Sequence, residues 1–407
     1  MSYCLPWGGK KERITLMPSR KSLLRYAGKM KDTRQELLAD VGAFEKLASQ
    51  MVEQNIKRVY IIVGQQSRKL KLCDSFVQIL QNAGVRCFLS THKKIEPDRF
   101  SIEACASECQ TYNCEAVVAF GGGKAIDVGK MVSVWRTNPW LSLYQMRGAG
   151  KIPNPGLPLY VAATTGSGAE SSACALIRQG KQISLYYSEY LIPRTVVLDP
   201  DLVLRLPMES MAKASILALT HAVEAYVSPR ASAFPADKAN ATIAVPIFFS
   251  YLEQCYKHGI GNEMYLQLMM APYYSGVAAR RIGFGYTHSL SLYLSDKYDI
   301  APGSVCAVLL PIILEYEFDR IIDPLVELAA LSHLCSSRAT KEEAARAFID
   351  GFKSLCRRVD LPAELSFLRM DDFGDIIRKA FNDAYQWSCP KKMTVKQAQA
   401  ILKKLRY

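Results

Sequence analysis

The 407-residue sequence lacks the features that would indicate a membrane, secreted or zinc-ribbon protein. No apolar segment reaches the ~20 residues that span a bilayer, and the N-terminal residues form no signal-peptide core. The twelve cysteines form no Cys-x-x-Cys pair, so neither a zinc ribbon nor a secreted disulfide framework is indicated. We therefore expect free thiols in a cytoplasmic protein.

The sequence also lacks a concentrated basic stripe, although its net charge is +13. Nucleic-acid-binding proteins usually gather their cations on one stripe with interleaved aromatic residues. Here lysines and arginines are spread along the chain. We interpret most of them as solvated surface, and we expect neither a nucleic-acid nor a membrane partner.

Apolar runs of strand length alternate with helical patterns in the first half of the sequence. Strands are expected at residues 59–63, 85–90, 117–120, 157–162 and 194–198, with helices at 41–54, 76–82 and 102–112. This alternation predicts a doubly wound parallel sheet, whose ligands bind at the carboxyl ends of the strands. Residues 1–35 are basic and weakly patterned, and we expect a peripheral strand or arm there.

The second half of the sequence has helical periodicity instead of strand patterns. Thr340-x-x-Glu343 and Thr394-x-x-Gln397 are capping boxes that predict the first residues of two helices. We therefore expect an α/β domain at residues 1–203 and an all-helical domain at residues 204–407.

Gly121, Gly122 and Gly123 end the apolar run at 117–120 and precede a helical segment that begins at Lys124. A strand that turns through glycines into a helix presents free backbone amides, which favour a phosphate or diphosphate. The spacing fits neither a P-loop nor the Rossmann fingerprint. A tight turn without a ligand is the alternative.

Two further loops follow strands of the same sheet. Gly64 comes after the strand at 59–63, so its loop is expected to face the same crevice as Gly121. The strand at 157–162 leads into Thr164, Thr165 and Ser167, which offer hydroxyl groups.

Three stretches together resemble the iron-containing (group III) alcohol dehydrogenases of the dehydroquinate-synthase-like superfamily. The stretch from Gly121 to Lys130 is similar to the family's GGGSxxDxxK, and Thr164 to Glu170 is similar to its TTAGTGSE. Asp199 to Tyr226 is similar to its DPxL…DALTHAxEAY. The resemblance implies an N-terminal dinucleotide-binding α/β domain, an all-α C-terminal domain, and hydride transfer between them. Relatives often form homodimers, which the resemblance implies here too.

The resemblance assigns a cofactor role to the loops described above. The predicted cofactor-binding residues are Gly64, Ser67, Lys69, Gly121, Gly122, Gly123, Lys124, Asp127, Thr164, Thr165 and Ser167. The glycines would hold the diphosphate, and Thr164 and Ser167 would line the nicotinamide side. Lys124 replaces the commoner Ser, and Asp127 with Lys130 could instead be a pair on one helix face.

Charge after Gly64 bears on the choice of cofactor. Family members that prefer NAD usually have an Asp there, whereas this chain continues with Gln-Gln and then Ser67, Arg68 and Lys69. An acid would repel a 2′-phosphate, and these three side chains could bind one. We therefore predict NADPH, with NADH as the alternative; Arg68 and Lys69 could also simply begin a solvent-facing helix.

The family's metal site, one Asp and three His, is only partly present. The resemblance places Leu217 at the Asp, His221 and His288 at two of the His, and Pro302 at the third His. It also places Leu292 at a substrate-side His. Two imidazoles are a poor site for a divalent ion. A metal such as iron or zinc, held by His221 and His288, is therefore doubtful, although Asp296, Asp299 or Cys306 could be recruited.

The predicted function is an NAD(P)H-dependent oxidoreductase that reduces a small aldehyde or ketone, neutral or anionic, to an alcohol. His221 or His288 would act as electrophile and proton donor, and Arg281 would anchor an anionic substrate. Arg280 is expected to face solvent. Two alternatives stay open: a metal-dependent alcohol dehydrogenase with substitute ligands, and an inactive family member that binds the nucleotide.

Overall fold

A six-stranded parallel sheet forms the first half of the molecule in the computed structural model, which describes residues 20–30, 35–92, 94–180, 182–259, 261–382 and 389–406. Its strands are β1 (Glu36–Ala39), β2 (Arg58–Val63), β3 (Arg86–Leu89), β4 (Ala116–Gly121), β6 (Leu159–Ala163) and β9 (Thr195–Leu198), in the spatial order β1-β9-β6-β4-β2-β3. Each pair of neighbours is parallel. Every residue of the central strand β4 is buried, as expected when helices cover both faces. The predicted doubly wound sheet is therefore confirmed.

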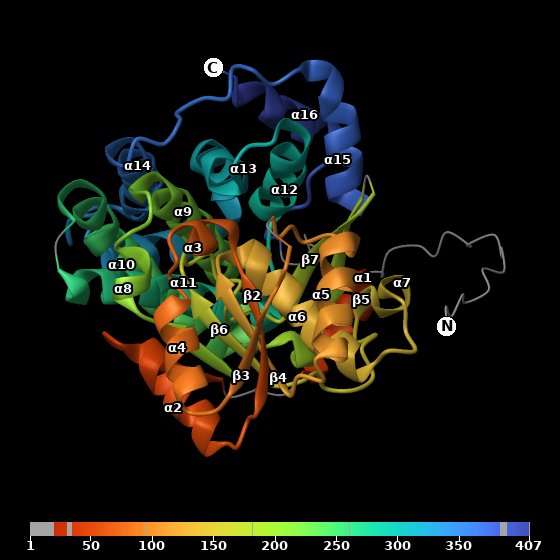
Figure 1. Cartoon of the computed structure of the whole chain (residues 1–407). Helices are drawn as coiled ribbons and strands as arrows, with labels where there is room; N and C mark the ends of the chain where they lie inside the picture. The colour runs from red at the N-terminus through yellow and green to blue at the C-terminus, as the bar shows by residue number, and fades with distance from the viewer. Residues whose placement is uncertain are drawn as a thin grey trace, which may run out of the picture.

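Helices cover the two faces of this sheet (Figure 1). They are α2 (Ala43–Glu53), α3 (Gln65–Lys69), α4 (Asp74–Asn82), α5 (Arg99–Thr111) and α6 (Gly123–Thr137). The short helix α7 (Leu143–Met146) follows α6 in the chain. Helices α2 and α4 pack together on one side, and α5 packs on α6 on the other. The strand order explains this division. β1, β2 and β3 follow one another in one direction across the sheet, and β4, β6 and β9 in the other. Because crossovers between parallel strands are right-handed, opposite directions place the connecting helices on opposite faces.

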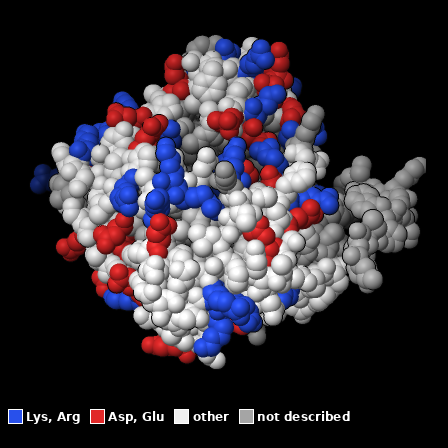
Figure 2. Space-filling model, viewed as in Figure 1, with Lys and Arg blue, Asp and Glu red and all other residues white. Residues whose placement is uncertain are grey.

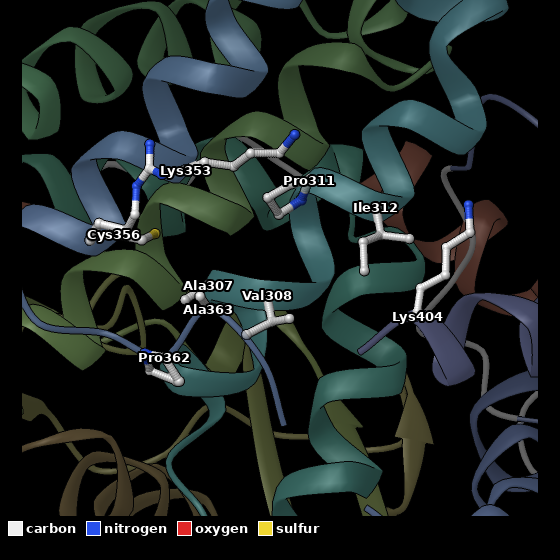
Figure 3. A pocket seen from close by; sticks show the side chains of 10 residues that line it. Ala307, Val308, Pro311, Ile312, Lys353, Cys356, Pro362, Ala363 and Lys404 are labelled. Carbon is white, nitrogen blue, oxygen red and sulfur yellow. The ribbon is translucent and has the colours of Figure 1, made fainter. Parts of the chain in front are cut away.

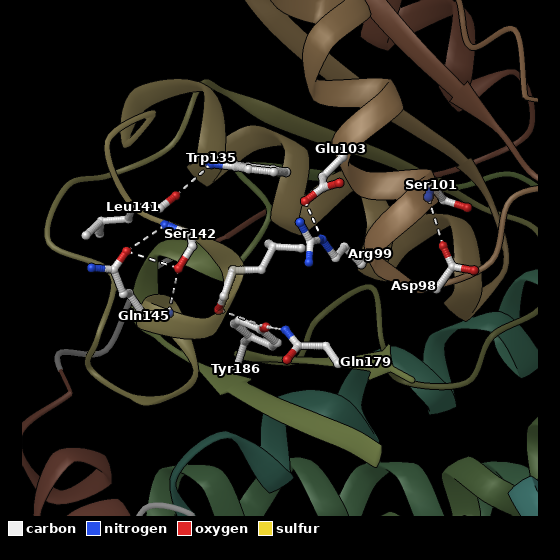
Figure 4. A network of polar contacts seen from close by, with 11 residues as sticks. Asp98, Arg99, Ser101, Glu103, Trp135, Leu141, Ser142, Gln145, Gln179 and Tyr186 are labelled. Atoms are coloured by element: carbon white, nitrogen blue, oxygen red, sulfur yellow. Dashed lines mark hydrogen bonds and ion pairs between the residues drawn. The ribbon is translucent and has the colours of Figure 1, made fainter. Parts of the chain in front are cut away.

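A smaller sheet, which the sequence pattern did not indicate, is formed by one strand before β6 and two strands after it. It consists of β5 (Gly148–Ala149), β7 (Cys174–Gln179) and β8 (Gln182–Tyr187), with β7 and β8 antiparallel. Gln179 donates to the Tyr186 hydroxyl at 2.5 Å, and this hydroxyl donates to the carbonyl of Leu143 at 2.9 Å (Figure 4). The hairpin is thereby tied to α7, whose first turn is capped by Ser142 and Gln145.

The N-terminal segment differs from the expected strand or arm. Residues 20–29 form helix α1 (Arg20–Lys29), and its Leu23 and Ala27 pack against side chains of β8. Residues 1–19 and 31–34 lie outside the described part of the chain. A helix that covers the small sheet therefore replaces part of the predicted arm.

The described residues after β9 contain helices and no strand. These helices are α8 (Pro200–Val203), α9 (Met208–Val227), α10 (Pro235–His258), α11 (Asn262–Ile282), α12 (Tyr286–Tyr298), α13 (Pro302–Leu331), α14 (Lys341–Arg358), α15 (Phe373–Asn382) and α16 (Val395–Lys404). Both predicted capping boxes are confirmed, since Thr340 and Thr394 accept from the backbone of Glu343 and Gln397. In the described part of the chain, every helix is too short or too polar to cross a bilayer.

Two separate apolar cores meet at α13. The main core joins the sheet to helices α9–α11 and α14. The second, which we call the C-terminal core, contains apolar side chains of α12, α13, α15 and α16, such as Leu294, Leu309, Ile377 and Leu402. Lysines and arginines alternate with acidic side chains over the face shown in Figure 2, in keeping with the expected solvated surface.

Candidate functional site

A pocket of about 170 Å³ lies between the loops at the carboxyl ends of β4 and β6 and helices α9, α11 and α12. We call it the cleft pocket. Its lining residues are Gly123, Asp127, Ser167, Gly168, Ala169, Ser172, Cys174, Leu176, Leu217, His221, Gly276, Phe284 and His288. Residues from several of the predicted motifs therefore converge on one cavity.

The glycine loop forms one wall beside the cleft pocket. Gly121 has φ +152, which a residue with a side chain rarely adopts, and α6 begins two residues later at Gly123. A Cβ atom on Gly122 would lie 2.2 Å from Thr165 Oγ1, and one on Gly123 would lie 3.2 Å from Ser167 Oγ. Within the described residues, no protein group accepts a hydrogen bond from the amides of Gly122 or Gly123. Free amides at the start of a long helix fit a diphosphate group.

The loop after β2 lies directly against the glycine loop, as predicted. The Gly64 amide donates to the Phe120 carbonyl at 2.8 Å, and a Cβ atom on Gly121 would lie 3.2 Å from the Gly64 Cα. The Thr164 amide donates to the Gly121 carbonyl at 3.1 Å, which joins the third loop. Lys124 is exposed and its ammonium pairs with Glu96 at 2.8 Å.

The side chains predicted to bind a 2′-phosphate are not all available. Ser67 is 1% exposed, so its hydroxyl group is not presented at the surface. The Arg68 guanidinium donates to the Ser90 carbonyl at 2.6 Å. Lys69 is exposed in the last turn of α3. Of the predicted trio, Lys69 is placed where it could meet a phosphate.

Asp127 lies in the second turn of α6 and lines the cleft pocket. Its carboxylate accepts a hydrogen bond from the Leu176 amide at 3.1 Å. Burial raises the pKa of Asp127 to about 6, although the nearby Lys130 acts in the opposite direction. This carboxylate therefore holds β7 against α6 at the edge of the pocket.

Lys130 is completely buried rather than exposed on a helix face. Its ammonium donates to the carbonyls of Ala169, Ser172 and Cys174 at 2.7, 3.0 and 2.8 Å, and to the Ser172 hydroxyl at 2.9 Å. Burial lowers the pKa of Lys130, and the negative charge of Asp127 partly offsets this. Because these three acceptor residues line the cleft pocket, Lys130 fixes the shape of that wall.

His221 and His288 lie side by side in the cleft pocket. His221 Nε2 and His288 Nδ1 are 2.8 Å apart, and each residue is 7% exposed. Burial lowers the pKa of His221 well below its ordinary value and that of His288 to about 4. Both rings are therefore neutral near pH 7, and one donates to the other. The Phe284 ring stacks on His288 with centroids 4.1 Å apart.

Glu224 fixes the backbone at His288, a role that the sequence analysis missed. Its carboxylate accepts from the amides of Gly285, Thr287 and His288 at 2.9, 2.7 and 3.4 Å, and so caps α12. Burial raises the pKa of Glu224 to about 7. A Cβ atom on Gly285 would lie 2.7 Å from this carboxylate. The position of Glu224 three residues after His221, on the same helix face, was the available signal.

The cleft residues do not fit a four-coordinate divalent ion. Leu217 lines the pocket, and Pro302 is the first residue of α13. No group of three or more His, Cys, Asp or Glu side chains converges among the residues that the structure describes. Two nitrogen ligands at about 2.0–2.1 Å from a tetrahedral zinc ion lie roughly 3.4 Å apart. The closer hydrogen-bonded pair of His221 and His288 differs from that geometry, and Asp296 is paired with Arg178.

Arg281 does not reach the cleft pocket, which contradicts its predicted role as a substrate anchor. Its guanidinium binds both carboxylate oxygens of Asp237, at 2.7 and 2.8 Å, and lies over the Phe234 ring. Arg280 is buried, not solvent-facing, and donates to the Ser171 carbonyl at 2.5 Å. Both guanidinium groups therefore serve packing between helices and loops.

Several residues that line the cleft pocket belong to none of the sequence motifs. Cys174 and Leu176 come from the small sheet, and Phe284 from the turn before α12. No Lys or Arg is among the lining residues. Besides its apolar walls, the cleft pocket has two neutral imidazoles, the Asp127 carboxyl and the hydroxyls of Ser167 and Ser172. Its chemistry suits an uncharged polar group such as a carbonyl.

Comparisons with known proteins agree with this architecture. The family model for iron-containing alcohol dehydrogenases matches residues 35–200, and that for the C-terminal part of Fe-containing alcohol dehydrogenases matches residues 211–406. Alcohol dehydrogenase 4 of Saccharomyces cerevisiae (strain YJM789) is 27% identical over 370 residues, 89% of this chain and 94% of that protein.

Two solved structures show the same fold. A 1,3-propanediol oxidoreductase superimposes with a TM-score of 0.86 at 23% identity, covering 92% of this chain and 100% of the other. The sulfoacetaldehyde reductase of Bifidobacterium kashiwanohense, solved in complex with NAD+, superimposes with a TM-score of 0.81 at 19% identity. It covers 93% of this chain and 99% of its own.

Proposed function

Because the chain belongs to the iron-containing alcohol dehydrogenase family, we propose that it reduces a small uncharged aldehyde or ketone to the alcohol with NADPH. The observation that carries the proposal is the position of the neutral His221–His288 pair beside a glycine loop whose amides are free. These two features supply the two requirements of the reaction: a place for the cofactor diphosphate and a proton donor for the substrate.

The glycine loop and its neighbours would hold the cofactor. The amides of Gly122 and Gly123 suit the diphosphate, and Thr165 and Ser167 bring hydroxyl groups within reach of the same loop. The bound nicotinamide would supply the hydride. Gly64 is followed by exposed Gln65 and Gln66 rather than an acid, so nothing there repels a 2′-phosphate, and Lys69 could attract it.

The histidine pair would supply the proton. As hydride reaches the carbonyl carbon, negative charge develops on the oxygen, and an imidazole N–H directed at that oxygen stabilises it. The oxygen takes a proton from one imidazole, and across the 2.8 Å contact the second imidazole passes its proton to the first. A proton from solvent then restores the second imidazole, so both rings end neutral. Glu224 keeps His288 in register by binding its backbone.

The cleft pocket favours small, uncharged substrates. Leu176, Leu217 and Phe284 give it apolar walls, and its volume is about 170 Å³. A charged carboxylate or sulfonate would be desolvated there without a cation to pair with. We therefore expect propanal-sized aldehydes to be better substrates than anionic ones, in contrast to the anionic aldehyde for which the sulfoacetaldehyde reductase is named.

The test is a steady-state assay of NADPH and NADH oxidation with propanal and with a carboxylated aldehyde, each with and without a chelator. We expect turnover of propanal with NADPH that the chelator leaves unchanged. Replacing His221 or His288 with Ala should lower kcat by about 10²-fold or more, whereas His258→Ala, an exposed residue of α10, should leave it unchanged.

Three results would replace the proposal. Loss of activity with the chelator and its return with iron or zinc would indicate a metal-dependent dehydrogenase with substitute ligands. NADPH binding without turnover of any short aldehyde would indicate an inactive nucleotide-binding protein. Absence of both binding and turnover would refute the dehydrogenase interpretation altogether.

A further inference from the structure

A second cavity, of about 480 Å³, lies between α13, α14 and α16 and shares no lining residue with the cleft pocket (Figure 3). We call it the seam cavity. One face of α13 forms its apolar wall through Ala307, Val308, Pro311 and Ile312. Volumes of 300–1,000 Å³ are typical of small-molecule sites. The seam cavity is therefore large enough for a ligand of that class.

The seam cavity lies where the two apolar cores fail to merge. Ala307 and Cys356 belong to the main core, whereas Val308 belongs to the C-terminal core and Ile312 packs against it. Protein interiors are normally close-packed, and atoms that line an unfilled space lose dispersion contacts. An apolar group in the seam cavity would restore those contacts and join the cores.

The rim of the seam cavity is cationic. Lys353 and Arg357 lie one turn apart on α14, and Lys404 lies in the last turn of α16. Figure 3 shows Lys353 and Lys404 on opposite sides of the cavity. No Asp or Glu is among the lining residues. Lys353 has an exposed partner, Asp350, at 3.4 Å, while Arg357 and Lys404 have no ion-pair partner among the described residues.

We propose that the seam cavity binds a small amphipathic anion, an alkyl chain with a carboxylate or phosphate head. The alkyl chain would lie along α13 against Val308 and Pro311, and the head would lie between Lys353, Arg357 and Lys404. An anion there would offset the mutual repulsion of three like charges. Because the cations come from α14 and α16, the ligand would also fix the C-terminal helices to the body of the helical half.

The test uses the full chain and equilibrium dialysis with decanoate, decyl phosphate and decanol. We expect saturable binding of one decanoate or decyl phosphate per chain, with decanol at least about tenfold weaker. Tighter binding of decyl phosphate would assign a phosphate head, and tighter binding of decanoate a carboxylate head. Equal binding of decanol would overturn the proposal, because the cations would then contribute nothing.

Two sets of variants locate the site. Lys353→Gln, Arg357→Gln and Lys404→Gln together should weaken decanoate binding at least about tenfold. The control triple Lys341→Gln, Arg346→Gln and Lys396→Gln changes the same net charge on the same two helices, outside the lining, and should bind as the unmodified chain does. If both triple variants lose decanoate affinity equally, or if the unmodified chain shows no saturable binding, the seam cavity is not the binding site.

A variant that keeps every charge covers the case in which the first triple misfolds. Ala307→Leu would fill the apolar wall and should weaken decanoate binding while the cations remain. Unchanged binding in a folded Ala307→Leu protein would contradict the placement of the alkyl chain. Because none of these residues lines the cleft pocket, the result is independent of aldehyde turnover.

Discussion

Replacing Glu224 with Gln tests whether this carboxylate holds His288 in place. The side chain accepts hydrogen bonds from three backbone amides at the start of α12. At pH 5 the raised pKa keeps Glu224 protonated in the folded chain, but its hydroxyl oxygen can still accept a hydrogen bond. The NH2 group of Gln cannot accept one and would meet a backbone N–H donor. A lost hydrogen bond that leaves a buried group unsatisfied costs about 1–3 kcal/mol. At pH 5 we therefore expect Glu224→Gln to be less stable than the unmodified chain by about 2 kcal/mol.

The pH dependence gives this prediction its sharpest form. Burial raises the pKa of Glu224 from 4.5 to about 7. An acid whose pKa is higher in the folded state than in the unfolded state adds its full stabilising free energy below the unfolded pKa. This stabilisation is lost as the pH rises through the folded pKa. The fall amounts to about 3 kcal/mol between pH 4.5 and 8. Gln does not titrate, so the stability difference between the two proteins should close over that range.

The measurement is the urea unfolding midpoint at pH 5, 6, 7 and 8, with kcat for propanal measured on the same samples. Glu209→Gln in the first turn of α9 is the matched control, because Glu209 is exposed and pairs with Lys213 at the surface. We expect the control to shift stability by less than about 1 kcal/mol. A stability difference between Glu224→Gln and the unmodified chain that is constant with pH would refute the raised pKa. An unchanged kcat would refute the positioning role.

Three further predictions concern buried ionisable groups. Lys130→Met should lower stability by several kcal/mol and raise the aldehyde KM, because three carbonyls of the pocket wall lose their hydrogen-bond donor. An unchanged melting temperature in calorimetry would contradict this prediction. Asp237→Asn removes the ion-pair partner of Arg281 and should lower stability by about 2 kcal/mol. It should leave kcat/KM unchanged, since Arg281 lies outside the cleft pocket. A fall in kcat/KM would indicate that Arg281 does contribute to substrate binding. The pKa of His288 is lowered to about 4 in the folded chain, so the unfolded chain binds a proton there more readily. Stability should therefore fall as the pH drops from 6.5 towards 4, and His288→Asn should reduce this fall. An NMR titration in which the His288 ring titrates near pH 6.5 would contradict the lowered pKa.

The sheet could be predicted because its strands are continuous apolar runs. Residues 59–63 and 117–120 were expected and belong to β2 and β4, which are buried on both faces. The hairpin of β7 and β8 was missed, although β7 has the alternating burial of a half-covered strand and Gly180, with φ +61, lies in the turn after it. Helix α1 was missed because its first residues are basic and its apolar face is short.

The loops of the candidate site could be predicted, but the direction of its charged side chains could not. The loops at Gly64 and Gly121 were expected to face one crevice, and a Cβ atom on Gly121 would lie 3.2 Å from the Gly64 Cα. Arg281 was assigned to the substrate, yet its partner Asp237 lies 44 residues earlier in the chain. Which face of a helix a guanidinium occupies depends on packing between such distant segments, and motif spacing does not contain that information.

The most direct test of the central claim is a fluorescence titration of NADPH with Gly122→Ala. A Cβ atom at Gly122 would lie 2.2 Å from Thr165 Oγ1 and would intrude on the free amides. Gly374→Ala is the control, because a Cβ atom there would meet nothing within 4 Å. If the glycine loop holds the cofactor diphosphate beside the histidine pair, Gly122→Ala will bind NADPH at least about tenfold more weakly. This corresponds to a loss of about 1.4 kcal/mol in binding free energy. Gly374→Ala will bind NADPH as the unmodified chain does. Equal affinity in both variants, or no NADPH binding by the unmodified chain, would contradict the claim.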